Sequence, residues 1–114
     1  MNTKTKGKAG ELFAVLYLKK KHYKIVEQNF RCRFGEIDII ARDNGALVFV
    51  EVKTRKNTDF QRPAESVNAR KQKRIITAAK YFLMQNLISD VACRFDVIEV
   101  MGEEINHITN AFTL

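Results

Sequence analysis

The chain has 114 residues, a formal net charge of +7, and 46% hydrophobic and 29% charged residues. This length fits a single domain, and the hydrophobic content excludes a chain that is disordered throughout. The longest nearly unbroken apolar run covers residues 12–18, far short of the about 20 residues that a membrane-spanning helix needs. We expect one domain over residues 9–114, preceded by a basic, flexible segment at residues 1–8, and no membrane contact.

The same apolar run follows several lysines, as in a secretory signal peptide. Glu11 lies at its start, however, three lysines follow it, and no small-residue cleavage site is present. These features favour a cytoplasmic protein. The cysteines, Cys32 and Cys93, form no metal-binding pattern with the two histidines. Any metal would therefore have carboxylate ligands, which favours a hard cation such as Mg²⁺ or Mn²⁺.

Charge is distributed unevenly along the chain. Residues 1–34 carry +7, residues 35–52 carry −3, residues 53–74 carry +6 and residues 75–114 carry −3. A short acidic segment thus lies between two basic ones, and such basic segments attract polyanions, usually nucleic acid. The alternative is a solvated surface on which the basic residues serve only solubility.

The first predicted element is a helix over residues 9–18, in which only Gly10 and Glu11 are not apolar. A helix that is apolar on nearly all sides is expected to be buried on several of them. Glu11 lies at helical spacing from apolar residues, so its carboxylate would need a partner in the core. The alternative is a first-turn glutamate that points to water and is favoured by the helix dipole.

Three strands are predicted next, over residues 23–34, 35–42 and 46–55. Between the last two lies Asn44-Gly45, and Asn-Gly flanked by β-branched residues is the strongest short-range signal for a hairpin.

A polar loop over residues 56–63 then precedes a helix that is capped by Asn68 and ends near residue 87. Strands over residues 93–101 and 105–112 follow, the last one short. The predicted apolar stripe of the second helix contains Ile75, Ala78, Ala79, Phe82, Leu83 and Leu87. The order α-β-β-β-α-β, with the short last strand, predicts an α/β fold.

The predicted two-residue turn fixes which residues of the hairpin face each other. It places Asp38 opposite Glu51 and Glu36 opposite Lys53, and these four side chains share one face because side chains alternate along a strand. The other face is then purely apolar, pairing Ile37 with Val52, Ile39 with Val50 and Ala41 with Val48. The acid-bearing face also continues into apolar residues, so the polar cluster lies at the end of a buried surface.

Carboxylates that oppose each other directly repel, and they raise each other's pKa unless a cation lies between them. A divalent cation on Asp38 and Glu51 would remove the repulsion, with Lys53 as a second positive group. The alternative is a surface charge ladder in which Glu36 pairs with Lys53 and Asp38 is solvated.

Several strings resemble known families. An Asp on one strand, followed by Glu51-Val52-Lys53 on the next, resembles the PD-(D/E)xK nuclease superfamily. The strings GKAGE, GEIDIIARDNGALVFVEVKTR, RFDVIEV and INHITNAF resemble the YraN-like family of small bacterial endonuclease-like proteins over nearly the whole chain. That family is similar in plan to archaeal Holliday-junction resolvases. The resemblance implies a restriction-endonuclease-like α-β-β-β-α-β core, with a central mixed sheet flanked by helices.

The resemblance also implies residue roles. Asp38 and Glu51 match the metal-binding acids, and Lys53 matches the lysine that steadies the attacking water and the scissile phosphate. Glu11 matches an acid of the first helix, and Glu36 matches the family string without an assigned role.

These roles predict a Mg²⁺- or Mn²⁺-dependent endonuclease, with DNA favoured as substrate, including branched or repair intermediates. The phosphate backbone would be held by the basic residues Arg55, Lys56, Arg62, Lys71, Lys73 and Arg74, with Gln72 as a further candidate. An enzyme of this size that cuts two strands would act as a homodimer. The alternatives are a nucleic-acid-binding module that keeps the fold without cutting, and an accessory partner in a DNA-processing complex.

Overall fold

The computed structural model describes the backbone of residues 3–55 and 67–113, and side chains from residue 8 onward. Its elements are α1 (Thr3–Lys20), β1 (Lys24–Cys32), β2 (Gly35–Asp43), β3 (Ala46–Arg55), α2 (Ala69–Gln85), β4 (Cys93–Met101) and β5 (Glu104–Phe112). Within these ranges, neither helix has the length and apolar character that a membrane crossing requires.

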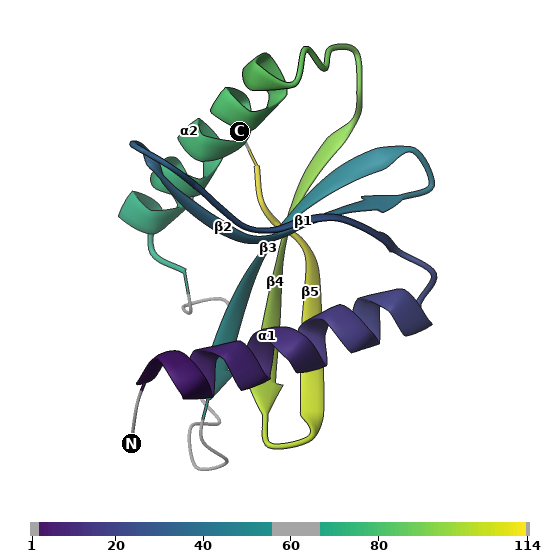
Figure 1. Ribbon diagram of the computed structural model, residues 1–114, viewed down its shortest axis with the longest axis vertical. Helices are drawn as coiled ribbons and strands as arrows, with labels where there is room; N and C mark the ends of the chain where they lie inside the picture. Colours follow the sequence, from purple (N-terminus) through teal and green to yellow (C-terminus); the bar gives the residue numbers. More distant parts are fainter. Residues whose placement is uncertain (1–2, 56–66, 114) are drawn as a thin grey trace.

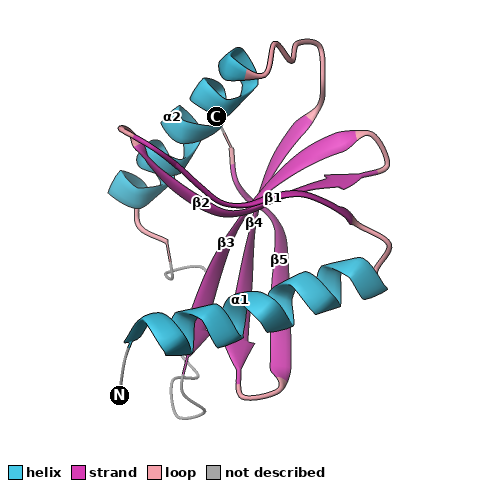
Figure 2. Ribbon diagram, in the orientation of Figure 1, coloured by secondary structure: helices cyan, strands magenta, loops and turns pink. Residues whose placement is uncertain are grey.

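The five strands form one sheet in the order β1-β2-β3-β4-β5. All neighbours are antiparallel except β3 and β4, which run parallel and are joined through α2. Figures 1 and 2 show a strongly twisted sheet with the two helices packed against it. The predicted α/β fold with a mixed sheet and two helices is therefore confirmed.

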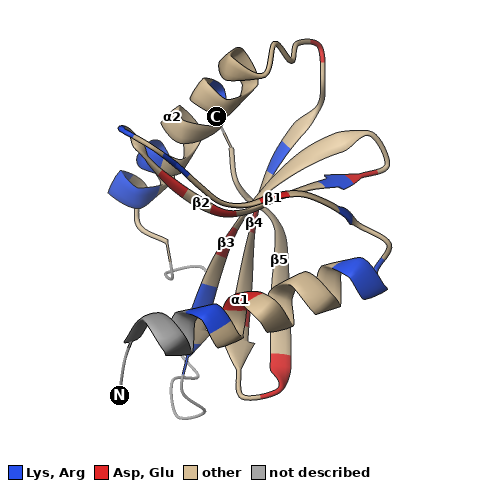
Figure 3. Cartoon of the chain, viewed as in Figure 1, with Lys and Arg blue, Asp and Glu red and all other residues tan. Residues whose placement is uncertain are grey.

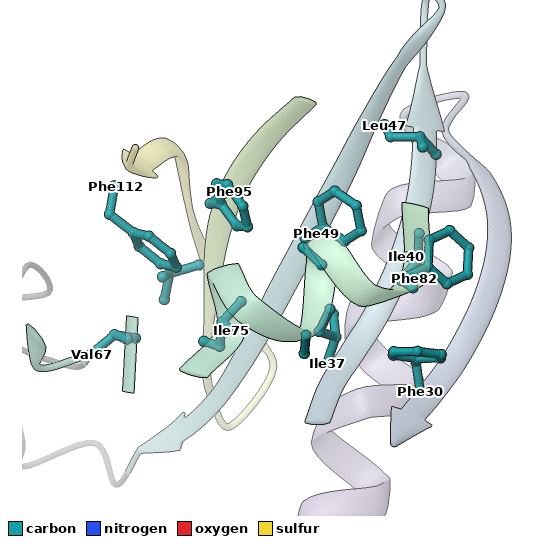
Figure 4. Packing of buried hydrophobic residues seen from close by; sticks show 13 residues of the cluster. Phe30, Ile37, Ile40, Leu47, Phe49, Val67, Ile75, Phe82, Phe95 and Phe112 are labelled. Atoms are coloured by element: carbon teal, nitrogen blue, oxygen red, sulfur yellow. The ribbon is translucent and has the colours of Figure 1, made fainter. Parts of the chain in front are cut away.

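Each helix covers a different hydrophobic cluster. On the α2 side, Phe82 contacts Phe49 edge-on with ring centroids 6.2 Å apart, and Phe95 stacks on Phe49 at 5.5 Å (Figure 4). On the α1 side, buried residues of the helix pack on β2, β3 and β4. This cluster contains Ala14, Val15 and Leu18 of α1 and, from the strands, Ile39, Ala41, Val48, Val50, Ile98 and Val100. Burial of this apolar surface is the main stabilising contribution to the fold.

The expectation that the first helix is buried on several sides is wrong. Leu12, Phe13 and Leu16 are exposed, while Ala14 and Leu18 are fully buried. The sheet covers one side of α1, and no element among the described residues covers the other (Figure 1).

Some element boundaries also differ from prediction. α1 begins at Thr3, ahead of the predicted residue 9. α2 begins after Asn68 as predicted but ends at Gln85, and Leu87 lies in the following turn with φ 55° and 92% exposure. Leu87 therefore does not belong to the apolar stripe. β5 spans nine residues, as many as β4, and is not short.

Candidate functional site

The hairpin of β2 and β3 carries the two predicted metal-binding acids. Asn44 and Gly45 have φ values of 49° and 90°, as a two-residue hairpin turn requires. Asp43 pairs with Ala46, and the predicted register is confirmed along the ladder as far as Ile39 and Val50.

Beyond that pair, the regular alternation of β2 breaks. Ile37 packs in the α2-side cluster and Ile39 in the α1-side cluster, so the predicted pairing of Ile37 with Val52 is wrong. The carboxylate of Asp38 takes the place of a ladder bond, because its Oδ2 accepts the backbone N–H of Val52 at 2.8 Å. On β1, Asn29 lies between the residues that pair with Ile37 and Ile39 and has a left-handed φ of 54°. The same place is therefore irregular in both strands.

The carboxyl groups of Asp38 and Glu51 meet at this irregularity. Their residues are only 8% and 5% exposed, and the two side chains are hydrogen-bonded to each other. Burial and the Glu51 carboxylate raise the pKa of Asp38 to about 8, because a charged form would be poorly solvated and next to a second negative charge. At neutral pH, the pair therefore keeps one proton between its two carboxyl groups. The prediction that these acids are close neighbours is confirmed.

Two lysines lie beside the carboxyl pair. Lys71, in the first turn of α2, forms an ion pair through Nζ with Oε2 of Glu51. Burial opposes the charge of Lys71, but the contact with Glu51 outweighs it and raises the Lys71 pKa. Burial and the neighbouring Lys71 ammonium lower the pKa of Lys53. The site thus combines one shared proton and one ion-paired ammonium with a second ammonium that gives up its proton more easily than usual.

Glu11 reaches the edge of this site from α1. Its half-buried carboxylate lies 3.1 and 3.3 Å from the amide nitrogen of Asn29, when that amide is oriented with its nitrogen toward Glu11. Burial raises the pKa of Glu11, and the charges of Glu36 and Glu51 add to the effect. Glu11 is not the fully solvated first-turn residue of the alternative interpretation.

The described residues contain no group of three or more His, Cys, Asp or Glu side chains close enough to hold a metal ion. Two carboxylates do come together, which suits Mg²⁺, because this ion binds through one or two carboxylates and keeps several waters. Glu11 contributes charge near the pair but does not complete a three-ligand cluster with it.

The remaining predicted residues surround this centre. Glu36 is exposed and pairs with Arg31 at 3.1 Å, so the alternative ladder between Glu36 and Lys53 does not form. Gln72 donates to the carbonyl of Val67 at 2.9 Å and braces the start of α2. Lys73 and Arg74 are exposed on α2. Two predicted phosphate-binding residues, Lys56 and Arg62, lie outside the described residues.

Sequence reasoning missed a buried acid beside the site. Glu99 pairs in register with Lys53 across the parallel strands, and its Oε2 lies 2.6 Å from Nε of Arg55. Asn106 donates to its other oxygen at 2.9 Å. The available signal was a charged residue inside the apolar strand string VIEV, since a buried carboxylate requires partners. Arg55, predicted to hold phosphate, is thus anchored at the end of β3.

A second buried polar network lies at the other end of β4. Asp96 is fully buried; its carboxylate accepts from Nε of Arg94 at 2.9 Å and from the backbone N–H of Asn110 at 2.9 Å. His107 Nε2 lies 2.7 Å from the same carboxylate, and Tyr17 of α1 reaches His107 Nδ1 at 3.1 Å. Burial alone would raise the Asp96 pKa, but these donors lower it below its usual range. Through Tyr17 and His107, this network ties α1 to β4 and β5.

Comparison with known proteins places the chain in a family. A family model described as "Uncharacterised protein family UPF0102" matches residues 10–100. A UPF0102 protein of Geotalea daltonii is 52% identical, covering 99% of this chain and 93% of its relative. One from Clostridioides difficile is 50% identical over 98% of this chain and 100% of that protein, and one from Persephonella marina is 48% identical over 96% and 94%. These relatives span the chain from α1 to β5, and the chain therefore belongs to the UPF0102 family, the YraN-like family that its sequence strings resemble.

Proposed function

We propose that this protein is a metal-dependent nuclease that hydrolyses phosphodiester bonds of nucleic acid, with DNA favoured. The observation that carries the proposal is the buried carboxyl pair of Asp38 and Glu51, with Lys71 ion-paired to Glu51 and Lys53 beside them. Perturbed carboxyl groups next to cations are typical of functional sites and are costly without a function. The restriction-endonuclease-like arrangement suggested by the sequence strings is part of this proposal.

Asp38 and Glu51 would hold the ion once the pair has released its proton to water, and a bound Mg²⁺ or Mn²⁺ would polarise the phosphate and acidify a water molecule. The chain's own residues supply the rest. Lys53 would offset the charge that develops on the phosphate, because its ammonium stands beside the carboxyl pair. Its lowered pKa makes Lys53 a better proton donor to a leaving oxygen than an ordinary lysine. Glu11 is placed to accept a hydrogen bond from a water at the rim of the site.

The proposal is tested by a cleavage panel with Mn²⁺ and with Mg²⁺, over single-stranded, duplex and branched DNA and RNA. Asp38→Asn and Glu51→Gln should lower cleavage by about 100-fold or more, as when a group that stabilises the transition state is removed. Glu103→Gln, at an exposed acid in the β4–β5 turn, is the matched control and should cleave like wild type. Cleavage that survives both site variants would exclude this centre.

One observation favours a second function, nucleic-acid binding without cleavage. The Lys71 ammonium already balances the charge of Glu51, so the pair does not need a metal for electrostatic balance. A protein of this kind would bind nucleic acid equally well in EDTA and would gain no stability from Mg²⁺ or Mn²⁺. Thermal unfolding with and without each metal separates the two functions, because a ligand that binds only the folded state raises the unfolding temperature.

A further inference from the structure

A cavity of about 520 Å³ opens beside the carboxyl pair, between the start of α2 and the β1–β2 turn. We call it the basic pocket; its lining contains Arg31, Cys32, Gly35, Glu36, Asn68, Arg70, Lys71, Arg74 and Ile75. Four of these residues are cationic and one is acidic. Figure 3 shows the blue first turns of α2 next to the acidic part of β2. The volume lies within the about 300–1,000 Å³ of small-molecule sites, on the scale of one nucleotide.

The cations of the basic pocket are poorly balanced by the fold. Among the described residues, no ion pair forms on Arg70 or Arg74. They stand four positions apart on one helix, where like charges destabilise each other, and no acid lies in the first turn of α2. Arg31 pairs with Glu36, and both side chains are largely exposed, so this pair contributes little to stability. The arrangement disfavours the helix on its own and suits an anionic ligand.

The wall of the pocket is not purely charged. Ile75 is buried, Cys32 is half-buried, and the Gly35 backbone faces Arg74. A phosphate alone would use only the arginines, whereas a nucleotide would also place its base against this apolar wall. Lys71 lines the pocket and binds Glu51, so the pocket and the carboxyl pair are direct neighbours.

We infer that the basic pocket binds one unpaired nucleotide of a nucleic-acid strand next to the cleavage site, with its phosphate on Arg70 and Arg74 and its base against the apolar wall at Cys32. A paired base is stacked inside the duplex and cannot enter such a cavity, whereas an unpaired base can leave the stack and pack on side chains and on guanidinium planes. The substrate class is therefore nucleic acid with a single-stranded part. This inference rests on the proposed function for its choice of ligand.

Binding is measured in EDTA, so that no cleavage is required, by anisotropy of a labelled 12-nucleotide oligo(dT) and of a 12-base-pair duplex. Wild type should bind the single strand more tightly. Arg70→Gln/Arg74→Gln should weaken single-strand binding about tenfold or more and duplex binding much less, because the lost contacts are specific to the pocket. Lys80→Gln, an exposed cation on the same helix outside the pocket, should leave both affinities within about twofold.

A second measurement probes the pocket itself by competition with thymidine 5′-monophosphate, inorganic phosphate and a polyglutamate peptide. Thymidine monophosphate should displace the single strand at the lowest concentration, and Arg70→Gln/Arg74→Gln should remove that advantage. Equal competition by phosphate would reduce the pocket to a general anion site, and better competition by the peptide would reassign it to an acidic protein partner. Equal weakening of single strand and duplex in the double variant would also overturn the inference.

The two proposals fail separately. Pocket-dependent single-strand binding without any cleavage would refute the nuclease and leave the pocket. Cleavage that depends on Asp38, together with unchanged strand preference in Arg70→Gln/Arg74→Gln, would refute the pocket and leave the nuclease.

Discussion

The titration of one residue, Asp38, makes the stability of the whole protein depend on pH. Asp38 ordinarily titrates near 3.8 and has a pKa of about 8 in the folded protein. The folded state therefore keeps a proton that the unfolded chain releases as pH rises above about 4. Its contribution to stability is complete below that pH and is lost progressively as pH rises to about 8.

Asp38→Asn should remove this dependence without changing the shape of the site, because an amide can still accept from Val52 and donate to Glu51. In EDTA, the free energy of unfolding of the variant relative to wild type should rise between pH 5 and pH 9, by about 1 kcal/mol or more. Urea unfolding at pH 5, 7 and 9 measures the difference. Asp90→Asn, at an exposed turn residue, should show the same pH dependence of the free energy of unfolding as wild type. If Asp38→Asn also shows the wild-type pH dependence, the shared proton is contradicted.

Lys71 gives a second test at the same scale. Lys71→Met leaves the buried Glu51 carboxylate without its ion-pair partner, so the variant should lose about 1–2 kcal/mol in EDTA. This is less than for a fully buried pair, because the Lys71 side chain is 44% exposed.

Mg²⁺ or Mn²⁺ should then stabilise Lys71→Met more than wild type, since a cation takes over the balance of Glu51. Thermal unfolding across a metal titration, with Lys80→Met as control, reads this out. If neither metal changes the unfolding temperature of Lys71→Met, the carboxyl pair is not a metal site.

At the scale of elements, local chemistry made much of this fold predictable. The Asn44-Gly45 turn and the Asn68 cap depend only on neighbouring residues, and the strands over residues 46–55 and 93–101 were predicted with their observed bounds. The register of β2 and β3 followed from the turn, and this register predicted that Asp38 and Glu51 are neighbours.

What escaped prediction depends on contacts distant in sequence. At the break, the Asp38 carboxyl group accepts from the backbone of Val52, and on β1 Asn29 has a left-handed φ; no local pattern indicates either feature. The partner of Glu51 comes from α2, 20 positions further along the chain, so Lys53 was the cation expected from strand alternation alone. The ion pair of Glu99 with Arg55 depends on the register in which β3 and β4 pair, and no tight turn between these strands fixes that register.

The approach of α1 to β3 sets the position of Glu11. A Cβ at Gly10 would lie 2.3 Å from Oγ1 of Thr54, so this glycine allows the close packing that brings Glu11 to the site.

Gly10→Ala sets two effects against each other. Alanine favours the helix by about 1 kcal/mol, while the contact with Thr54 forces one element to shift. In wild type, the substitution should be neutral or destabilising and should lower cleavage; in a Thr54→Ala background it should stabilise by about 1 kcal/mol. A double-mutant cycle by urea unfolding measures the coupling, and additive effects would show that the two residues do not constrain α1.

At the scale of the whole molecule, the net charge of +7 attracts polyanions. The logarithm of DNA affinity should fall steeply with the logarithm of salt concentration, since most contacts would be made to phosphates.

Replacing Lys71, Lys73 and Arg74 together by Gln should weaken binding and flatten the salt slope by about 2–3, because each phosphate contact contributes about 0.9. The matched control replaces Lys19, Lys20 and Lys21, at the other end of α1 from the site. DNA affinity measured from 50 to 300 mM salt gives the slope for each variant. Equal slopes for the two triple variants would show that Lys71, Lys73 and Arg74 are solvated surface residues that do not contact phosphate.

The strand order has a consequence for the path of folding. β1, β2 and β3 are joined by tight turns and β4 and β5 form a second hairpin, so only the parallel pairing of β3 with β4 closes a long stretch of chain. Local pairings form faster than distant ones, and both carboxyl groups lie in the first meander. We expect the carboxyl groups to meet before α2 packs and brings Lys71 to Glu51, so their repulsion destabilises the early assembly.

Asp38→Asn should then accelerate refolding at pH 9 while leaving unfolding nearly unchanged, whereas Lys71→Met should act mainly on the unfolding rate. Stopped-flow rates that reverse this assignment would place the meeting of the carboxyl groups after the rate-limiting step.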